Sequence, residues 1–330
     1  MSRVLVTGGA GFIGSHVAER LKSSGHDVHV LDRFSYAGRI KNLAEILGDT
    51  RLWVGDLKEW DVCVGLAKYG FDAVIHMASN THVDHSIDNP VVFTRDNVLA
   101  TNQLLHAFQL HCPTARFIVY STDEVYGPTP IGRKFDESTQ FRPSNAYSAS
   151  KVGIEGLASS YFVTHGMNIV TVRPCNTYGP RQHPEKAIPK FVHQAMQGGP
   201  ITVHGDGQGA RDWLHVSDHA AAIETLLERG VSGEAYNIAA CDEHRDIEVA
   251  YKVLEYSGQD CPVSFIKQRL GHDRRYFMDG TKLRALGWSP RVPFNDGLRA
   301  AVDWNMKNID WYADNAVTVC ARDLTMVFSA

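Results

Sequence analysis

The sequence Thr7-Gly8-Gly9-Ala10-Gly11-Phe12-Ile13-Gly14 decides the fold class of this chain. It follows a short apolar run, Arg3–Val6, and opens a stretch of helical length, Ile13–Ser23, whose apolar residues recur every three or four positions. Glycine at 8, 11 and 14 permits a tight turn, a close approach of the backbone to a pyrophosphate, and close packing of helix against strand. A strand, a glycine turn and a helix in this order predict a dinucleotide-binding unit.

Further short apolar runs alternate with stretches of helical length along the first half of the chain. This alternation is typical of βαβ units. Strands that helices cover on both faces read as nearly continuous apolar runs, so we predict an α/β fold with a Rossmann-type, doubly wound parallel sheet. The later strands are expected at Val28–Leu31, Leu52–Val54, Ala73–Met77, Phe117–Tyr120 and Ile169–Val172.

After about residue 175, prolines and glycines break the chain into shorter elements. We predict that residues 1–175 form the dinucleotide-binding domain and carry the catalytic residues. Residues 176–330 are expected to form mainly a smaller α/β substrate domain, with some segments returning to the first sheet. Its strands are expected near Ile201–Val203, Tyr236–Ile238 and Val263–Ile266. Residues 313–330 carry no motif that predicts a function.

Composition excludes several classes of protein. The chain has 330 residues, 44% of them hydrophobic, with a formal net charge of -4 and a mean hydropathy of -0.22. It lacks the runs of like charge typical of nucleic-acid-binding arms and any apolar stretch near the roughly 18 residues that span a bilayer. The apolar residues between Arg3 and Thr7 are too few for a signal peptide, and dispersed cysteines without a CxxC pair favour reduced thiols. We therefore predict a cytoplasmic protein without a nucleic-acid or membrane partner.

A carboxylate at the end of the second predicted strand bears on the choice of dinucleotide. Asp32 stands 18 residues beyond Gly14, where an acidic side chain binds the adenosine ribose hydroxyls and repels a 2′-phosphate. This favours NAD over NADP, although the adjacent Arg33 weakens the preference. Asp56 and Leu57, after the third strand, are expected to flank the adenine.

Tyr147 and Lys151 are four residues apart, which places a phenol and an ammonium group on one face of a helix. A free tyrosine has a pKa of about 10 and is a poor base at neutral pH. A lysine cation one turn away, with a positively charged nicotinamide ring nearby, would stabilise the phenolate. The pair can therefore take a proton from a hydroxyl group while hydride leaves the same carbon.

The glycine turn, the Tyr147–Lys151 pair and Asn176-Thr177-Tyr178-Gly179-Pro180 together resemble the extended short-chain dehydrogenase/reductase superfamily of nucleotide-sugar enzymes. The resemblance narrows at Ser121-Thr122-Asp123-Glu124-Val125-Tyr126-Gly127, because related epimerases and decarboxylases generally lack the Asp-Glu pair. That pair is characteristic of dTDP-glucose 4,6-dehydratases and their UDP-glucose relatives. The resemblance covers about residues 3–312 and implies NAD as cofactor and a nucleoside-diphosphate hexose as substrate.

The resemblance also implies a role for each catalytic residue. Tyr147, assisted by Lys151, would deprotonate the C4 hydroxyl while NAD takes the C4 hydride. Glu124 would remove the C5 proton that the new ketone acidifies, and a protonated Asp123 would donate to the departing C6 hydroxyl. Hydride would then return to C6 and a proton to C5. Thr122 would bind the sugar near C4. Neighbouring carboxyl groups with different environments suit one base and one acid.

Cofactor and substrate contacts follow from the same resemblance. The expected cofactor-binding residues are Gly8, Gly11, Phe12, Ile13, Gly14, Asp32, Arg33, Ser35, Asp56, Leu57, Met77, Ala78, Ser79, Thr81, Tyr147, Lys151 and Thr177. The expected substrate-binding residues are Thr81, Thr122, Asn176, Lys186, Ala187, Thr202, His204, Arg211, Asn237, Arg269 and His272. For any single substrate residue, packing or a surface ion pair is an equally good interpretation. His82 and His85 have no third ligand spaced to help, so no metal is expected.

The chain departs from the family pattern near the expected active site. The family usually has glutamate where this chain has Asn80, Ser-Pro where it has Asn145-Ala146, and a second asparagine where it has Thr177. These changes could retune substrate choice without removing the chemistry. The amphipathic stretches that begin near Thr101 and Lys151 correspond to helices that pair in this superfamily, which implies a homodimer with a four-helix interface.

Three other functions stay open from the sequence. A nucleotide-sugar 4-epimerase would share the oxidation by Tyr147 but needs no C5 base, so Asp123-Glu124 speaks against it. A dehydratase could act on another nucleotide sugar, such as a UDP-N-acetylhexosamine. A non-catalytic NAD- or nucleotide-sugar-binding regulator would not need the complete catalytic set. The nucleotide base is open as well, because one methyl group is worth only about 1–3 kcal/mol in an apolar pocket.

Overall fold

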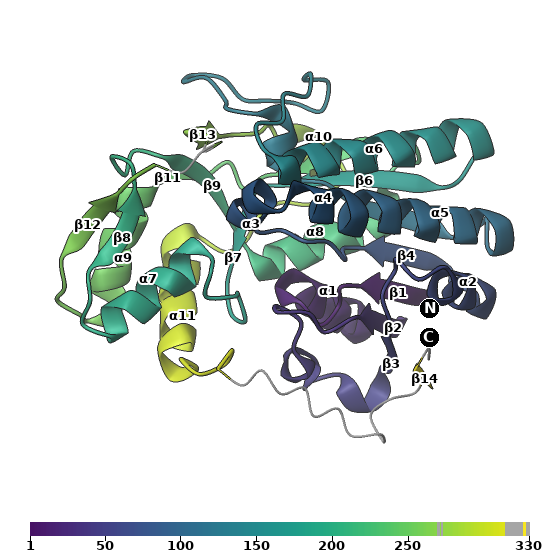
Figure 1. The fold of residues 1–330 in the computed structure, drawn as a ribbon, viewed down its shortest axis with the longest axis horizontal. Coiled ribbons are helices and arrows are strands. Elements are labelled where there is room, and N and C mark those ends of the chain that lie inside the picture. Colours follow the sequence, from purple (N-terminus) through teal and green to yellow (C-terminus); the bar gives the residue numbers. More distant parts are fainter. Residues whose placement is uncertain (269–270, 272, 314–325, 328–330) are drawn as a thin grey trace.

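Eight parallel strands form the central sheet of the computed structural model, which describes residues 1–268, 271, 273–313 and 326–327 (Figure 1). In spatial order the strands are β10 (Ala235–Ile238), β6 (Ile169–Pro174), β5 (Arg116–Tyr120), β4 (Ala73–His76), β1 (Arg3–Thr7), β2 (Asp27–Asp32), β3 (Arg51–Val54) and β14 (Met326–Val327). From β1 the chain adds β2 and β3 on one side, and then β4, β5 and β6 on the other. The carboxyl ends of β1 and β4 therefore lie at the switch point where open α/β sheets bind ligands.

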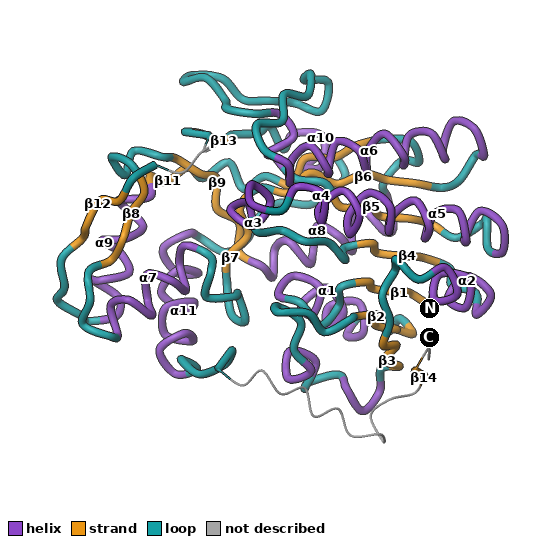
Figure 2. Tube along the Cα trace, viewed as in Figure 1, coloured by secondary structure: helices purple, strands orange, loops and turns teal. Residues whose placement is uncertain are grey.

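Helices cover both faces of this sheet (Figure 2). Alternate strand residues point to opposite faces, so Val4 and Val6 pack in one apolar core with α1 and α8, whereas Leu5 packs in another with α2, α5 and α6. The bounds of these helices are α1 (Phe12–Ser23), α8 (Val216–Arg229), α2 (Trp60–Tyr69), α5 (Ala100–His111) and α6 (Ala146–His165). The predicted doubly wound sheet is confirmed, and burial on both faces explains why its strands have no polar alternation.

A third apolar core lies beside the large sheet, among α7, α9 and α11 (left in Figure 1). Two small sheets accompany it: β12 pairs with β8, and β9 pairs with β7, β11 and β13. The helices are α7 (Ala187–Met196), α9 (Asp246–Ser257) and α11 (Phe294–Lys307). The strands are β7 (Asn176–Tyr178), β8 (Ile201–His204), β9 (Ala210–His215), β11 (Glu243–Arg245), β12 (Val263–Ile266) and β13 (Arg275–Tyr276).

Short helical segments connect these elements. They are η1 (Ile40–Leu43), η2 (Leu47–Asp49), α3 (Val83–Asp88), α4 (Pro90–Phe93), the π-helical η3 (Thr94–Leu99), η4 (Asp123–Tyr126) and α10 (Thr281–Arg284). Among the described residues, no helix has both the length and the apolar character that crossing a membrane requires.

One strand expected in the smaller domain lies elsewhere. Tyr236–Ile238 belongs to β10, which pairs in parallel with β6 at the edge of the large sheet. The preceding helix α8 packs on α1 and so carries the chain back across the face of that sheet. The other strands lie within two residues of their expected bounds.

Candidate active site

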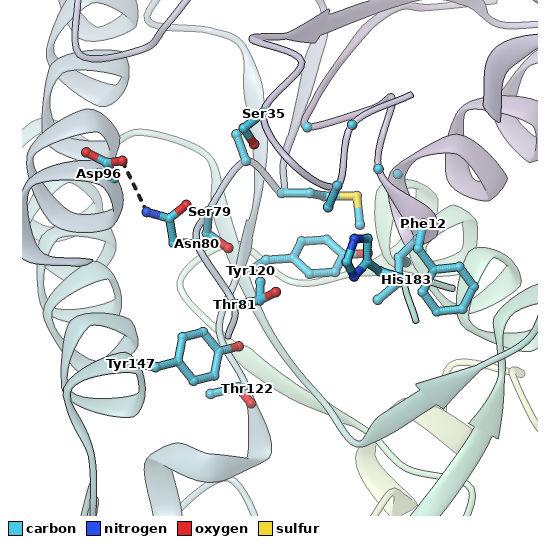
Figure 3. A pocket seen from close by; sticks show the side chains of 18 of the residues that line it. Phe12, Ser35, Ser79, Asn80, Thr81, Asp96, Tyr120, Thr122, Tyr147 and His183 are labelled. Atoms are coloured by element: carbon cyan, nitrogen blue, oxygen red, sulfur yellow. Dashed lines mark hydrogen bonds between the residues drawn. The ribbon is translucent and has the colours of Figure 1, made fainter. Parts of the chain in front are cut away.

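A deep cavity, here called the central cavity, opens at the carboxyl ends of β1, β4, β5 and β6 (Figure 3). Its walls are the glycine turn of residues 8–14, Asp32, the strand ends at 77–81 and 120–124, and Tyr147 and Lys151 of α6. All of the residues predicted to bind the cofactor line it, as do all five predicted catalytic residues. The fold therefore brings both sets into one space.

The glycine turn has the geometry that a pyrophosphate requires. Gly8 has a φ of +68°, and a Cβ atom there would lie 2.9 Å from the Cα atom of Ala78. A Cβ atom at Gly14 would collide with the carbonyl oxygen of Gly8. Neither Gly8 nor Gly14 can therefore carry a side chain, which leaves the start of α1 open to a diphosphate.

Asp32 is held rigidly at the end of β2. Its Oδ2 accepts from the backbone N–H of Ala10 at 3.0 Å, and its Oδ1 accepts from that of Phe34 at 2.8 Å. Burial raises the pKa of Asp32, and these two backbone hydrogen bonds oppose that shift. The result is a fixed acceptor beside the cavity, suited to ribose hydroxyls.

Arg33 faces carboxylates rather than an open phosphate site. Its Nη1 lies 3.0 Å from Oδ2 of both Asp56 and Asp96. Its Nη2 donates to Asn80 Oδ1 at 3.2 Å, and Asn80 Nδ2 donates to Asp96 at 3.1 Å (Figure 3). Asn80, where the family usually has glutamate, thus belongs to a network of hydrogen bonds and ion pairs that engages the Arg33 guanidinium. This arrangement favours NAD over NADP.

Tyr147 and Lys151 occupy the inner end of the central cavity. Lys151 Nζ donates to Ser79 Oγ and to the Tyr120 carbonyl, both at 3.0 Å, and lies 6.0 Å from the centre of the Tyr147 ring. Burial lowers the pKa of Lys151 to about 7, although Glu155 opposes this. Burial, with Glu124, raises the pKa of Tyr147. A cationic nicotinamide ring in the cavity would favour the phenolate.

Asp123 and Glu124 are adjacent but lie in different environments. Asp123 is 5% exposed, and burial together with Glu124 raises its pKa to about 8. Its Oδ1 accepts from Thr122 Oγ1 at 3.1 Å, whereas its Oδ2 has no hydrogen-bonding partner among the described residues. Glu124 is half-buried and accepts at Oε2 from Asn145 Nδ2 at 3.1 Å. The pair therefore offers a protonated acid beside a carboxylate.

Only some of the predicted substrate residues line the central cavity. They are Thr81, Thr122, Asn176 and Lys186, and Lys186 Nζ donates to the Thr81 carbonyl at 3.2 Å. Ala187 follows directly as the first residue of α7 but is not part of the lining. Arg269 and His272 lie outside the described residues.

The remaining substrate predictions fall on residues with contacts inside the protein. Thr202 bonds to Gln194, and the His204 ring lies 3.2 Å from the Lys267 carbonyl. The lining of the central cavity includes neither. Arg211 is buried and donates to the carbonyls of Asp273 and Arg274.

Asn237 requires a correction. It is fully buried, and its Nδ2 donates to the carbonyls of Phe135 and Asp279 while its Oδ1 accepts from the Tyr126 hydroxyl. The side chain therefore fastens β10 to neighbouring segments. It cannot line the nucleotide base, because its polar atoms are committed to the protein interior.

Residues 4–239 match the NAD dependent epimerase/dehydratase family. The chain belongs to this family. It is 43% identical over 305 residues to the low-salt glycan biosynthesis protein Agl12 of Haloferax volcanii, an alignment that covers 91% of this chain and 97% of that protein. It is 43% identical over 320 residues to a dTDP-glucose 4,6-dehydratase of Streptomyces niveus, covering 94% of each. The solved structure of DesIV, a dTDP-glucose 4,6-dehydratase from Streptomyces venezuelae with NAD bound, is 38% identical, with a TM-score of 0.91 over 95% of this chain and 100% of that one.

The lining also contains residues that the family motifs did not assign. Tyr120 and Cys175 could have been found from their position at the carboxyl ends of β5 and β6. Asp96 carries no such signal, because it comes from the π-helical segment far along the sequence. The unassigned lining residues are Leu31, Ala37, Gly38, Gly55, Asn80, Asp96, Ala100, Tyr120, Ser121, Pro174, Cys175, Gln182, His183 and Glu185.

Proposed function

We propose that this chain is an NAD-dependent hydro-lyase that converts a nucleoside-diphosphate glucose into the 4-keto-6-deoxy sugar with loss of one water. The observation that carries the proposal is the carboxyl pair, in which a buried Asp123 with a pKa of about 8 adjoins a half-buried Glu124. An enzyme that only inverts C4 has no use for this acid and base. The similarity to dTDP-glucose 4,6-dehydratases supports the same conclusion.

NAD suits the residues of the central cavity. The glycine turn, which cannot carry side chains at Gly8 and Gly14, suits its pyrophosphate, and the fixed carboxylate of Asp32 suits its adenosine ribose. When bound, NAD accepts hydride from C4 and supplies it again to C6. At the inner end, Tyr147 takes the proton of the C4 hydroxyl and Lys151 supplies the positive charge that stabilises the phenolate.

Asp123 and Glu124 carry out the elimination of water. The C4 ketone acidifies the C5 hydrogen, and Glu124 removes it as a proton. The electron pair left at C5 forms the C5–C6 double bond, and the C6–O bond breaks. Asp123 donates its proton to the departing oxygen, which leaves as water. When hydride adds to C6, the electron pair of the double bond moves to C5 and takes up a proton there, which completes the 4-keto-6-deoxy sugar. Thr122 bonds to Asp123 and, from the same turn, can bind the sugar near C4.

The test is to incubate the enzyme with dTDP-glucose, UDP-glucose and UDP-N-acetylglucosamine and to measure product mass. Dehydration predicts a product lighter by one water, whereas epimerisation leaves the mass unchanged. Glu124→Gln should abolish water loss and retain bound NAD. Because the two nucleotide bases differ by one methyl group, the relative kcat/KM for dTDP-glucose and UDP-glucose identifies the natural substrate. A parent enzyme that binds NAD but changes none of these sugars would contradict the proposal.

We also propose a homodimer with a four-helix interface formed by α5 and α6 of each copy. An apolar groove at the start of α5 is lined by Val98 and Leu99 of η3, by Leu157 of α6, and by Val91 of α4, which is 76% exposed. Exposed apolar surface of this kind is typical of protein interfaces. Light scattering after gel filtration should give twice the chain mass of 36.6 kDa.

A cytoplasmic location is proposed on chemical grounds. Cys63, Cys112, Cys175, Cys241 and Cys261 are free thiols in the described part of the chain. Free thiols are usual in a reducing compartment. Fractionation of the producing cells tests this location.

A further inference from the structure

Asn145 contacts both Glu124 and the start of α6, the helix that carries Tyr147. It has no role in the oxidation or elimination steps proposed above. It precedes α6 in an extended conformation, with φ of −146° and ψ of 169°. Its Oδ1 accepts from the backbone N–H of Ser148 at 2.9 Å, and its own N–H donates to Ser148 Oγ at 3.3 Å. These reciprocal bonds form a capping box, which stabilises the first turn of the helix that carries Tyr147.

The other end of the same amide faces the proposed C5 base. Asn145 Nδ2 donates to Glu124 Oε2 at 3.1 Å. The orientation of the amide is determined chemically, because only its oxygen can accept from the Ser148 N–H and only its NH2 group can donate to a carboxylate. One side chain thus bonds both to the start of α6 and to Glu124.

The segment between Glu124 and Asn145 keeps the hydrogen bond between these two side chains in place. Gly127 directly follows the turn that carries Glu124 and has a φ of +71°. A Cβ atom at Gly127 would lie 2.5 Å from the carbonyl oxygen of Arg142, so the two segments touch. The Arg142 N–H donates to the Val125 carbonyl at 2.9 Å. The catalytic turn and the residues just before α6 are therefore fastened to each other beside Asn145.

We propose that Asn145 is a positioning residue for proton removal from C5: it holds the Glu124 carboxylate in register with Tyr147, two residues further along the chain. The inference rests on the proposed function. It is specific to asparagine, because the task needs an acceptor for the helix and a donor for the base. Aspartate caps a helix equally well but presents a second carboxylate to Glu124. Serine, usual here in the family, also caps but has a shorter side chain and carries no amide.

Removing the Asn145 amide is expected to slow the removal of the C5 proton and to leave the oxidation of C4 unchanged. Without the amide donor, Tyr147 still oxidises C4 but Glu124 is less well placed to take the C5 proton. The oxidised sugar therefore waits longer on the enzyme, and the nicotinamide stays reduced during that wait. A general loss of structure would slow oxidation and elimination alike and would not raise the reduced fraction.

The test compares Asn145→Asp, Asn145→Ser and Ser148→Ala with the parent. Misplacing a catalytic group can cost up to about 100-fold, so we expect Asn145→Asp to lower kcat about 10- to 100-fold and Asn145→Ser to lower it less. In both, the ultraviolet absorbance of reduced nicotinamide during turnover should rise, and incorporation of solvent deuterium at C5 should slow. Ser148→Ala is the matched control, because it weakens the capping box and leaves the Asn145–Glu124 bond intact.

The outcomes separate this inference from the proposed function. A parent that releases no water from any nucleoside-diphosphate glucose overturns the function. A parent that dehydrates normally, with Asn145→Asp at the same kcat or with a lower kcat but no added reduced nicotinamide, overturns only the positioning role. Bound NAD and the melting temperature of each variant show that it is folded, so a slow variant cannot be dismissed as a damaged one.

Discussion

At the scale of single residues, the protonation of Asp123 connects stability with catalysis. Burial and Glu124 raise its pKa from 3.8 to about 8. Between these values the folded chain holds a proton that the unfolded chain has lost, so folding stability falls by up to about 1.4 kcal/mol per pH unit. Asparagine has nearly the shape of aspartate but no titrating proton, so Asp123→Asn does not lose folding stability as the pH rises. We expect it to raise the melting temperature between about pH 6 and 8 while lowering kcat about 100- to 10,000-fold, since it removes the proton donor.

Melting curves of parent and variant across pH 5 to 9, with kcat at each pH, provide the measurement. The difference in melting temperature should widen as pH rises towards 8 and then level off. Asp303→Asn, at an exposed position on α11, is the control and should shift neither quantity. Equal melting temperatures of parent and Asp123→Asn at every pH would mean that the native Asp123 is ionised at neutral pH.

Residue type predicts a site well only where the chemistry permits few alternatives. The sequence could predict that Asp123, Glu124, Tyr147 and Lys151 share one site, because acid, base and phenol each need a particular side chain at a particular spacing, and all four line the central cavity. The residue type of Arg211 leaves its role open, because a guanidinium can donate to carbonyls inside the protein as well as to a phosphate, and Arg211 donates to backbone carbonyls.

Secondary-structure elements could likewise be predicted only where the sequence pattern leaves few alternatives. Strands buried on both faces carry continuous apolar runs, so β1 to β6 could be predicted closely. Strands of two or three residues are too short to show a period, and β11, which reads Glu-His-Arg, has no apolar residue at all. The strand signal also says nothing about the partner, which is why β10 was expected in the wrong sheet.

A buried ion pair joins two of the large elements that carry the site. Arg173 of β6 lies 2.7 Å from Glu155 of α6, and each side chain is 6% exposed. Arg173 also donates to the Tyr126 hydroxyl at 2.6 Å. Removing one partner leaves the other charge buried, so Glu155→Leu or Arg173→Met should each cost about 3–5 kcal/mol of unfolding free energy.

A double-mutant cycle by denaturant unfolding checks this pair. Glu155→Leu combined with Arg173→Met should cost less than the sum of the single changes, because no charge is then left unpaired. Glu234→Gln breaks the exposed pair with Lys282 and, as control, should cost under about 1 kcal/mol. Additive single costs would contradict the view that the two charges compensate each other.

At the scale of the whole molecule, Trp311 and Tyr312, after α11, link the elements around the third apolar core to segments beside the central cavity. Trp311 Nε1 donates to Asn42 Oδ1 at 2.8 Å, and the Tyr312 hydroxyl donates to the Arg181 carbonyl at 2.6 Å. Arg181 in turn forms a bidentate ion pair with Glu19 of α1. The Tyr312 ring packs edge-on against His183, which lines the cavity.

These contacts predict slow release of NAD, since the cavity wall at His183 cannot move outward without breaking them. Each hydrogen bond is worth about 0.5–1.5 kcal/mol, so replacing both Trp311 by Leu and Tyr312 by Phe should speed NAD dissociation about 5- to 150-fold. The NAD retained after repeated gel filtration and the rate of its exchange with labelled NAD measure this. Tyr251→Phe, on the exposed face of α9, is the matched control. If the double variant holds NAD as tightly as the control, the cofactor leaves without breaking these contacts, and the hydrogen bonds of Trp311 and Tyr312 serve stability alone.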